Sequence, residues 1–318
     1  MTTFGDQVFQ YGGAPVSSGP QVPFTTGKTF FVHSVTGSNG NSGRKPAEPL
    51  ATLDYAVGLC TASKYDVIVL MPGHAETLAA AAAIALDVAG ITIVGIGTGA
   101  LRPTFTMNAA AATITVAASN MSIKNCLFIS TFAAVATVFD NVNAVVAKDF
   151  TIDSCEFRDS SNTLNIVKCF RSGTTANQAD GFTFTNNKVI SIMGTPTAAT
   201  TCVLSAAAQD RFTLTDNVVI RSAALNNTAV LLAMGANNHT LMTIARNRTN
   251  TPNTGTTAGE LISGGGTGSS GHVYDNYSWH LAATGLLAPL STKLAFSQNF
   301  CSITGAADKQ PVVNPLLV

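Results

Sequence analysis

The chain has 318 residues, and its 17 basic residues balance its 17 acidic ones. Only 11% of the residues are charged, against about a quarter in ordinary soluble domains. No basic stripe is visible, so the composition argues against a nucleic-acid-binding protein. The low charge indicates a surface partly covered by other copies of the chain or by a partner. Small polar residues on flat β-faces would explain the same composition equally well.

Residues 1–27 are rich in Gly, Pro and Ser, as in an extended segment. Large apolar residues interrupt this segment, and a pure linker would lack them. We therefore expect an N-terminal arm that becomes ordered against a neighbouring subunit or another partner. The arm residues expected to make such contacts are Phe4, Val8, Phe9, Tyr11, Pro15 and Phe24. The opening residues have neither the basic region nor the apolar core of a signal peptide, so no export by that route is expected.

Residues 28–65 predict an N-terminal cap made of a strand, a loop and one short helix. Residues 49–60 place Leu50, Leu53, Val57 and Cys60 on one side of that helix. A helix at this point would cover the unpaired strand edges at the open end of the following structure. The loop at residues 37–43 contains no carboxylate, so we expect tight-turn chemistry there and no calcium site.

A short phrase then recurs about every thirty residues within the range 66–303. In each copy two apolar residues alternate with polar ones, as Phe182 and Phe184 do. Period two predicts a strand with one buried face, and repetition at this interval predicts a solenoid. We expect an all-β, right-handed parallel β-helix. The copies that carry this prediction are residues 120–126, 149–155, 181–187, 211–217, 241–247, 271–276 and 294–299.

The closing residues of these copies should lie above one another in a core ladder. Asn tolerates the left-handed backbone of a turn, and stacked amides can bond along the axis. The ladder would consist of Cys126, Cys155, Asn187, Asn217, Asn247, Asn276 and Asn299. The six cysteines show no metal-binding spacing and are expected to be buried and reduced. A disulfide between the first two ladder cysteines is possible but not needed.

Two further segments bear on location. Residues 77–100 carry a single charge, yet they are mostly Ala and Gly and alternate like a strand, so we expect no membrane span. The tail, residues 304–318, ends in an apolar stretch that we expect to cap the far end of the solenoid or to contact a partner.

An enzymatic function would require carboxylates on one groove, and in a glycosidase the two catalytic carboxyl groups lie roughly 5–10 Å apart. Neighbouring copies do not repeat the acid at Asp153, so we interpret the candidates as solvated polar residues and expect no catalytic residue, cofactor or metal. The candidates weighed are Asp153, Glu156 and Asp159 with Arg158, then Asp216 and Asp275, and the pair His74 and Glu76. For the last pair, a local hydrogen bond or a partner contact is favoured. His239, His272 and His280 share no metal spacing, and Tyr277 or Trp279 could stack on a sugar ring.

Residues 31–43, 49–60, 66–77 and 90–97 resemble the opening of pectin-lyase-like β-helix proteins. The sequence of residues 71–77, together with that of residues 4–8 and 11–16, most resembles virion structural proteins of tailed bacteriophages. The resemblance covers about residues 1–100 by motif. It implies a homotrimer that contacts the major capsid protein or another virion protein, with a host surface glycan as a further candidate partner. It also implies location in the virion. We expect a non-enzymatic head decoration or head-spike protein; the alternative is a tail-associated receptor-binding protein or tailspike acting on host surface polysaccharide.

Overall fold

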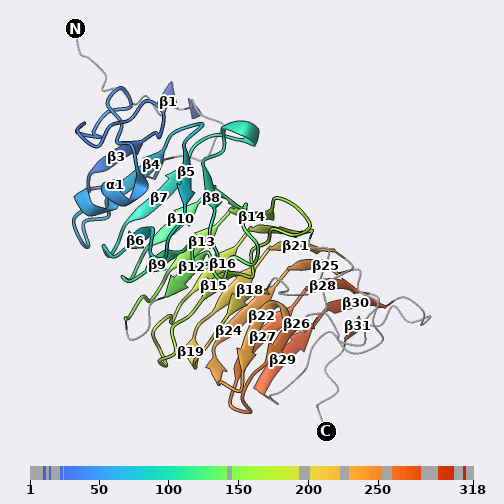
Figure 1. Cartoon of the computed structure of the whole chain (residues 1–318). Coiled ribbons are helices and arrows are strands. Elements are labelled where there is room, and N and C mark those ends of the chain that lie inside the picture. The colour runs from blue at the N-terminus through green and yellow to red at the C-terminus, as the bar shows by residue number, and fades with distance from the viewer. Residues whose placement is uncertain are drawn as a thin grey trace.

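The computed structural model describes residues 10–11, 14–15, 22–23, 25–141, 145–192, 201–222, 229–251, 260–280, 293–303 and 311–312. In these residues the chain winds into a solenoid of short parallel strands with a turn about every thirty residues (Figure 1). The strands form three long sheets. The expected all-β parallel β-helix is confirmed, with one short α-helix in the described part of the chain.

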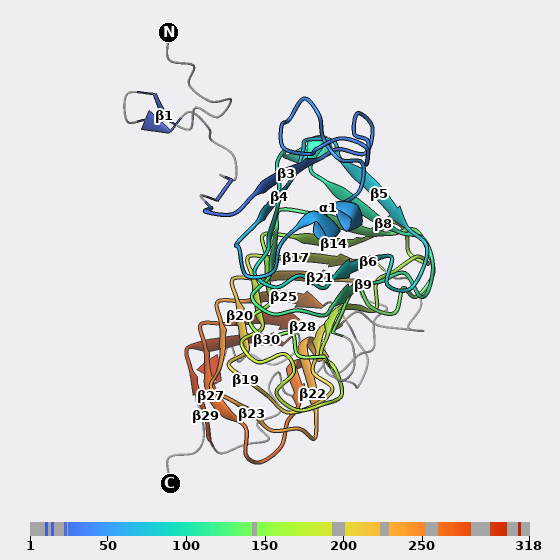
Figure 2. The ribbon, with the colours of Figure 1, turned by 90° about the vertical axis from the view of Figure 1, so that its left-hand side faces the viewer.

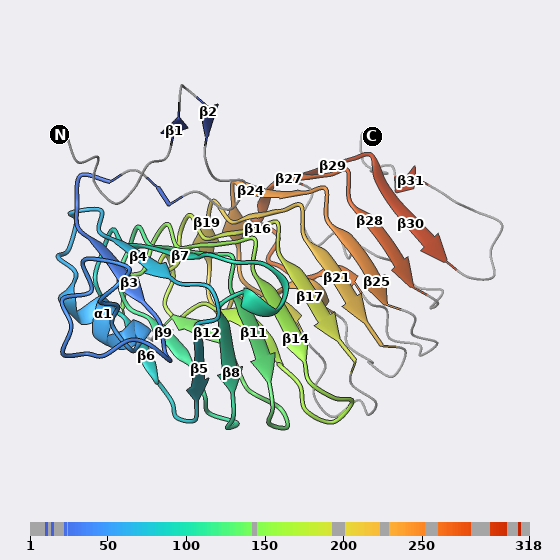
Figure 3. The same cartoon turned by 90° about the horizontal axis from the view of Figure 1, so that it is seen from above.

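Sheet 1 contains, in spatial order, β3 (Thr29–Val32), β4 (Val67–Leu70), β7 (Thr92–Gly95), β10 (Ser122–Lys124), β13 (Thr151–Asp153), β16 (Thr183–Thr185), β20 (Thr213–Thr215), β24 (Met242–Ala245), β27 (Ser270–Tyr274) and β29 (Lys293–Ser297). Sheet 2 contains β5 (Ala75–Leu78), β8 (Thr104–Met107), β11 (Leu127–Ser130), β14 (Glu156–Asp159), β17 (Lys188–Ser191), β21 (Val218–Arg221), β25 (Arg248–Thr251), β28 (Tyr277–His280), β30 (Asn299–Ile303) and β31 (Pro311–Val312). Figure 3 shows the sheet 2 strands side by side along the solenoid.

Sheet 3 contains β6 (Ile84–Leu86), β9 (Ile114–Val116), β12 (Phe139–Asn141), β15 (Lys168–Arg171), β18 (Thr201–Leu204), β22 (Ala229–Gly235) and β26 (Glu260–Gly264). Two small pairs complete the strands: β1 (Gln10–Tyr11) with β2 (Ala14–Pro15), and β19 (Gln209–Asp210) with β23 (His239–Thr240). A 3-10 turn, η1, spans Gly99–Leu101. Of the described helices, none has the length and apolar character needed to cross a membrane.

Stacking in register puts like side chains over like inside the solenoid. In sheet 1, Ile123 lies between Ile93 and Ile152 of the adjacent strands. In sheet 2, Phe128 stacks on Phe105 and on Phe157, with ring centroids 5.4 and 5.1 Å apart. Each such buried apolar side chain contributes about 1.5–3 kcal/mol of transfer free energy. A single turn cannot bury these faces alone, so the turns stabilise one another.

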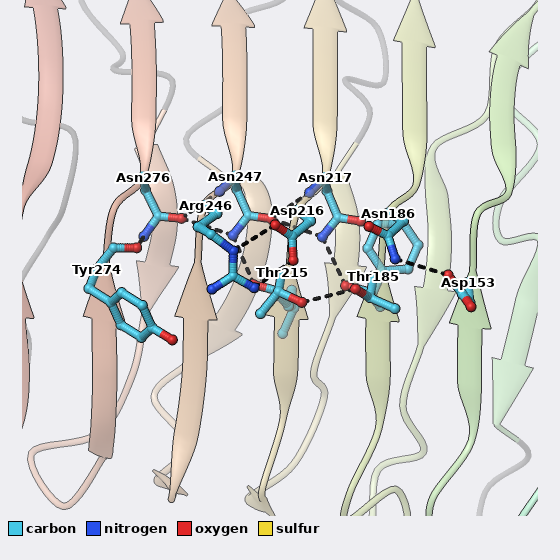
Figure 4. Close-up of polar contacts among 12 residues, drawn as sticks. Asp153, Thr185, Asn186, Thr215, Asp216, Asn217, Arg246, Asn247, Tyr274 and Asn276 are labelled. Carbon is cyan, nitrogen blue, oxygen red and sulfur yellow. Dashed lines mark hydrogen bonds and ion pairs between the residues drawn. The ribbon is translucent and has the colours of Figure 1, made fainter.

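The closing asparagines form a continuous ladder at the corner between sheets 1 and 2 (Figure 4). The Oδ1 of Asn217 accepts the backbone N–H of Asn187 at 3.0 Å, and the Oδ1 of Asn247 accepts that of Asn217 at 3.1 Å. The Nδ2 of Asn217 donates to the carbonyl of Phe184 at 2.8 Å and to Asn247 Oδ1 at 2.9 Å. The same bonds continue through Asn276 to Asn299, and Cys155 N–H begins them by donating to Asn187.

The backbone of this corner differs from the expectation. The left-handed residue is the one that precedes each ladder residue, such as Asn186, Asp216 and Arg246, with φ of 55°, 60° and 55°. The expectation that the ladder Asn itself takes this conformation is wrong. The positive φ at the preceding residue turns the chain, and the next side chain can then point into the solenoid, where its amide finds partners.

The helix α1 (Leu53–Leu59) is shorter than the expected 49–60 because Leu50 pairs with Val32 as a bridge. The Thr52 hydroxyl caps its start by accepting from Tyr55 N–H. It buries Leu53, Ala56 and Val57 at the N-terminal end of the solenoid (Figure 2). Since β3 pairs in parallel with β4, the strand expected in the cap is the first strand of sheet 1 itself.

Both chain ends are described only in part. Of the expected arm contacts, Phe4, Val8, Phe9 and Phe24 lie outside the described residues, and only the backbone of Tyr11 and Pro15 is described, in the antiparallel pair β1–β2. In the tail, β31 pairs antiparallel with β30, so this segment adds a strand at the end of sheet 2.

Candidate functional site

A groove of about 730 Å³ runs along the outer surface at the corner between sheets 1 and 2. Its lining comes from three successive turns. The first residue of each corner and the first residue of the next strand face it, because both point away from the packed interior. The lining residues are Asp216, Val218, Arg246, Arg248, Asp275 and Tyr277.

Asp216, Arg246 and Asp275 occupy the same left-handed corner position on consecutive turns, with φ of 60°, 55° and 54°. Arg246 Nε and Nη2 donate to the two carboxylate oxygens of Asp216 at 2.7 and 2.6 Å (Figure 4). These bonds hold the pKa of Asp216 below its usual range. Asp216 therefore stays ionised at neutral pH, which suits an acceptor and is the wrong state for a general acid.

The groove is also lined by the aromatic ring of Tyr277 and by a second guanidinium, that of Arg248. Tyr277 is 48% exposed. It is the residue after the ladder residue Asn276, which in turn follows Asp275. Arg248 is exposed and starts β25, and its side chain has no hydrogen-bond or ion-pair partner in the part of the chain that the structure describes. The groove thus offers a flat ring face, a free guanidinium and a carboxylate on adjacent strands.

The sequence candidates Asp153, Glu156 and Asp159 do not share one groove. Asp153 is on the outer side of β13, 3.5 Å from Lys124, and Glu156 is 3.3 Å from Arg102 and 3.8 Å from Arg158. Asp159 points into the solenoid and is 3% exposed. In β14 the side chains alternate, so Phe157 and Asp159 face inward while Glu156 and Arg158 face outward.

Asp159 is held by three donors inside the solenoid. Its Oδ2 accepts from Ser191 Oγ at 2.7 Å and from Ile192 N–H at 3.1 Å, and its Oδ1 accepts from Ile166 N–H at 3.0 Å. Burial nevertheless raises the pKa of Asp159 to about 6. A carboxyl with a raised pKa can serve as a general acid, but this one has no access to a substrate at the surface.

His74 and Glu76 serve the N-terminal cap. His74 is fully buried, and its Nδ1 accepts the N–H of Ser34 at 3.1 Å, which leaves the proton on Nε2. That Nε2 is 2.9 Å from Glu76 Oε1, although the direction of the contact is poor for a hydrogen bond. The same Oε1 accepts the N–H of Leu53 at 2.6 Å, so Glu76 holds the first turn of α1.

The loop at residues 37–43 is hydrogen-bonded to the segment before α1. Asn39 Oδ1 accepts the N–H of Ala51 at 3.0 Å, and Asn41 Nδ2 donates to the carbonyl of Pro49 at 2.8 Å. The amide groups of this loop are thus used in backbone bonds that shape the turn, as the sequence suggested for a loop without carboxylates.

The other three histidines considered as metal ligands differ in their surroundings. His239 is buried, with Nε2 2.6 Å from Ser205 Oγ, whereas His272 is exposed on β27, and the side chain of His280 lies outside the described residues. Among the described residues, no three His, Cys, Asp or Glu side chains gather as a metal site would require. Cys126, Cys155, Cys169 and Cys202 are buried thiols.

Arg246, Arg248 and Val218 were missed by the sequence reading. The signal that could have found Arg246 was in the repeat itself, at the residue before each ladder position. Aligning that position over consecutive copies gives Asp216, Arg246 and Asp275 in a row, which places unlike charges about 4.8 Å apart along the axis.

The geometry defines a pectin-lyase-like parallel β-helix with an open polar groove on one corner. The sequence matches no family model, and no curated protein matches it. Solved structures of similar fold include a rhamnogalacturonan lyase, at a TM-score of 0.50 and 11% identity over 86% of this chain and 87% of that chain. The pectate lyase Pel9A is similar at a TM-score of 0.52 and 12% identity, over 90% of this chain and 79% of that chain. At such identities the similarity shows the fold alone.

Proposed function

We propose that the protein is a non-enzymatic structural component of a phage particle, a homotrimeric β-helix attached to the capsid as a decoration or head-spike protein. There it would stabilise the particle or present an adhesive surface. The phage assignment is supported by the resemblance of the opening residues to virion structural proteins. The observation in the structure that best supports a non-enzymatic role is the way in which the carboxylates are used.

Most of the described ion pairs join one turn of the solenoid to another. Lys148 Nζ is 2.9 Å from Asp180, and Arg171 Nη2 is 2.6 Å from Asp140; each pair spans about thirty residues of sequence. The groove pair Asp216–Arg246 follows the same scheme at 2.6 Å. Carboxylates engaged in this way hold neighbouring turns together. This use suits a rigid scaffold better than proton transfer.

The proposal is tested with the full chain and with a variant that lacks residues 1–27. We expect both to sediment as trimers, and we expect only the full chain to attach to particles that lack this protein. Attachment of the shortened variant would contradict the role given to the arm. A full chain that sediments as a monomer at the concentrations of the attachment assay would contradict the trimer.

The second candidate function is a tail-associated receptor-binding protein or tailspike acting on host surface polysaccharide. The groove favours it, because an exposed Tyr277 ring beside the Arg248 guanidinium is a suitable platform for a sugar. Incubation of the protein with purified host polysaccharide distinguishes the two. New reducing ends or unsaturated products would establish the tailspike and refute the non-enzymatic proposal. Binding that Tyr277→Ala abolishes, without products, would establish a receptor-binding surface.

A further inference from the structure

Arg221 is a buried cation without a counter-charge among the described residues. It is the last residue of β21, points into the solenoid and is 2% exposed. Its Nε, Nη1 and Nη2 have no hydrogen-bond partner among the residues that the structure describes. A guanidinium is a donor-only group, and removing an unpaired one from water is costly in free energy. Arg171 and Arg246, by contrast, each meet a carboxylate.

The last residues of successive sheet 2 strands form a row of polar side chains that point into the solenoid, and Arg221 is one of them. Ser191 is its register partner on β17, and Ser191 Oγ donates to Asp159 one turn further down. Thr251 ends β25, the strand on the other side of β21. Thr251 is 1% exposed, and its Oγ1 also has no hydrogen-bond partner in the described chain. Two adjacent turns therefore each have donors in the same buried region that find no acceptor within the described part of the chain.

Asp159 does not supply the missing charge. It lies two turns from Arg221, roughly 9.6 Å along the axis at the spacing of neighbouring strands. Its oxygens already accept from Ser191 Oγ and from two backbone N–H groups. Burial lowers the pKa of Arg221 only to about 10, so the guanidinium is still a cation at neutral pH. A water molecule would satisfy its hydrogen bonds but would not balance its charge.

We propose that Arg221 and the Thr251 hydroxyl bind a small inorganic anion, of the size of chloride, inside the solenoid. Both side chains can donate to such an ion from neighbouring strands. The close packing of the interior restricts the ligand to an ion of this size, because Val219, Val230 and Leu231 around the same turn are fully buried. The inference is independent of the proposed function, since the site lies within the fold.

The test measures urea unfolding of the full chain at constant ionic strength, while sodium chloride replaces sodium gluconate. We expect a saturable rise in stability, with the folding equilibrium constant about 100-fold higher at a chloride concentration 100 times the Kd. Arg221→Met should lose this saturable response. The control Arg248→Met, which removes an exposed guanidinium from β25, should keep it. A response that is equal in the wild type and in Arg221→Met would overturn the proposal.

Thr251→Val keeps the shape of the side chain and removes the hydroxyl, so it tests the site even if Arg221→Met does not fold. We expect it to need about tenfold more chloride for the same gain, as expected for the loss of one hydrogen bond to an ion. Crystals grown in bromide should show anomalous density within hydrogen-bond distance of Arg221 and Thr251. Bromide-grown crystals without density there, or an unchanged chloride response in Thr251→Val, would contradict the assignment.

Discussion

Removing one amide from the middle of the asparagine ladder should be among the most damaging single changes in this protein. In Asn217→Ala, the N–H of Asn187 loses its acceptor and the carbonyl of Phe184 loses its side-chain donor. Asn247 Oδ1 keeps one of its two donors, the backbone N–H of residue 217. One buried N–H is then unsatisfied, at about 1–3 kcal/mol, and a buried carbonyl has lost one hydrogen bond, at about 1 kcal/mol. We expect a loss of about 3 kcal/mol, a large part of the stability of a typical domain.

The assay is urea unfolding followed by the fluorescence of Trp279, the single tryptophan of the chain. The matched control is Asn250→Ala, which removes an exposed amide from the outer face of β25 and should change stability by less than about 0.5 kcal/mol. Asn217→Asp should be worse than Asn217→Ala at neutral pH, because a buried carboxylate would face the Phe184 carbonyl. Equal losses in Asn217→Ala and Asn250→Ala would refute the reasoning.

Three further outcomes are expected. Leu241 is 67% exposed with φ of 54°, so Leu241→Gly should stabilise the protein by up to about 1 kcal/mol in urea unfolding, and Leu241→Ala should not. Burial raises the pKa of Asp159 from 3.8 to about 6, so its contribution to stability is fully present below about pH 4 and is lost as the pH rises through 6. The wild type should lose about 3 kcal/mol across this range relative to Asp159→Asn, and parallel pH profiles would contradict this. Glu76→Ala leaves the Leu53 N–H without its acceptor and should destabilise the cap by about 1–3 kcal/mol, whereas Glu76→Gln keeps an acceptor oxygen; faster amide exchange across α1 in Glu76→Ala alone is the expected readout.

The repeat was readable from sequence because its chemistry is local. Alternation at Phe182 and Phe184, and at equivalent pairs in other copies, specifies one buried face, and only stacked turns can bury it. The spacing of about thirty residues then fixes which copies become neighbours. The ladder positions follow from the same spacing, since residues one turn apart lie over each other in the parallel register.

Other features required the folded chain. The sequence grouped Asp153, Glu156 and Asp159, but the alternation within β14 sends Asp159 into the solenoid and keeps Glu156 outside. The left-handed residue at each corner was assigned one position too late, because both choices satisfy the turn and only the side-chain contacts distinguish them. The charges that meet across turns, such as Arg246 and Asp216, depend on which corner residues point outward.

The sequence by itself determined the strand period, the length of a turn and the column of closing residues, because these depend on short-range alternation repeated along the chain. Only the tertiary structure decided which polar side chains share a surface, which ones are paired and which one, Arg221, is buried without a partner among the described residues. The physical reason is that pairing and burial depend on atoms about thirty or more residues away, and their approach is set by the direction in which each corner turns.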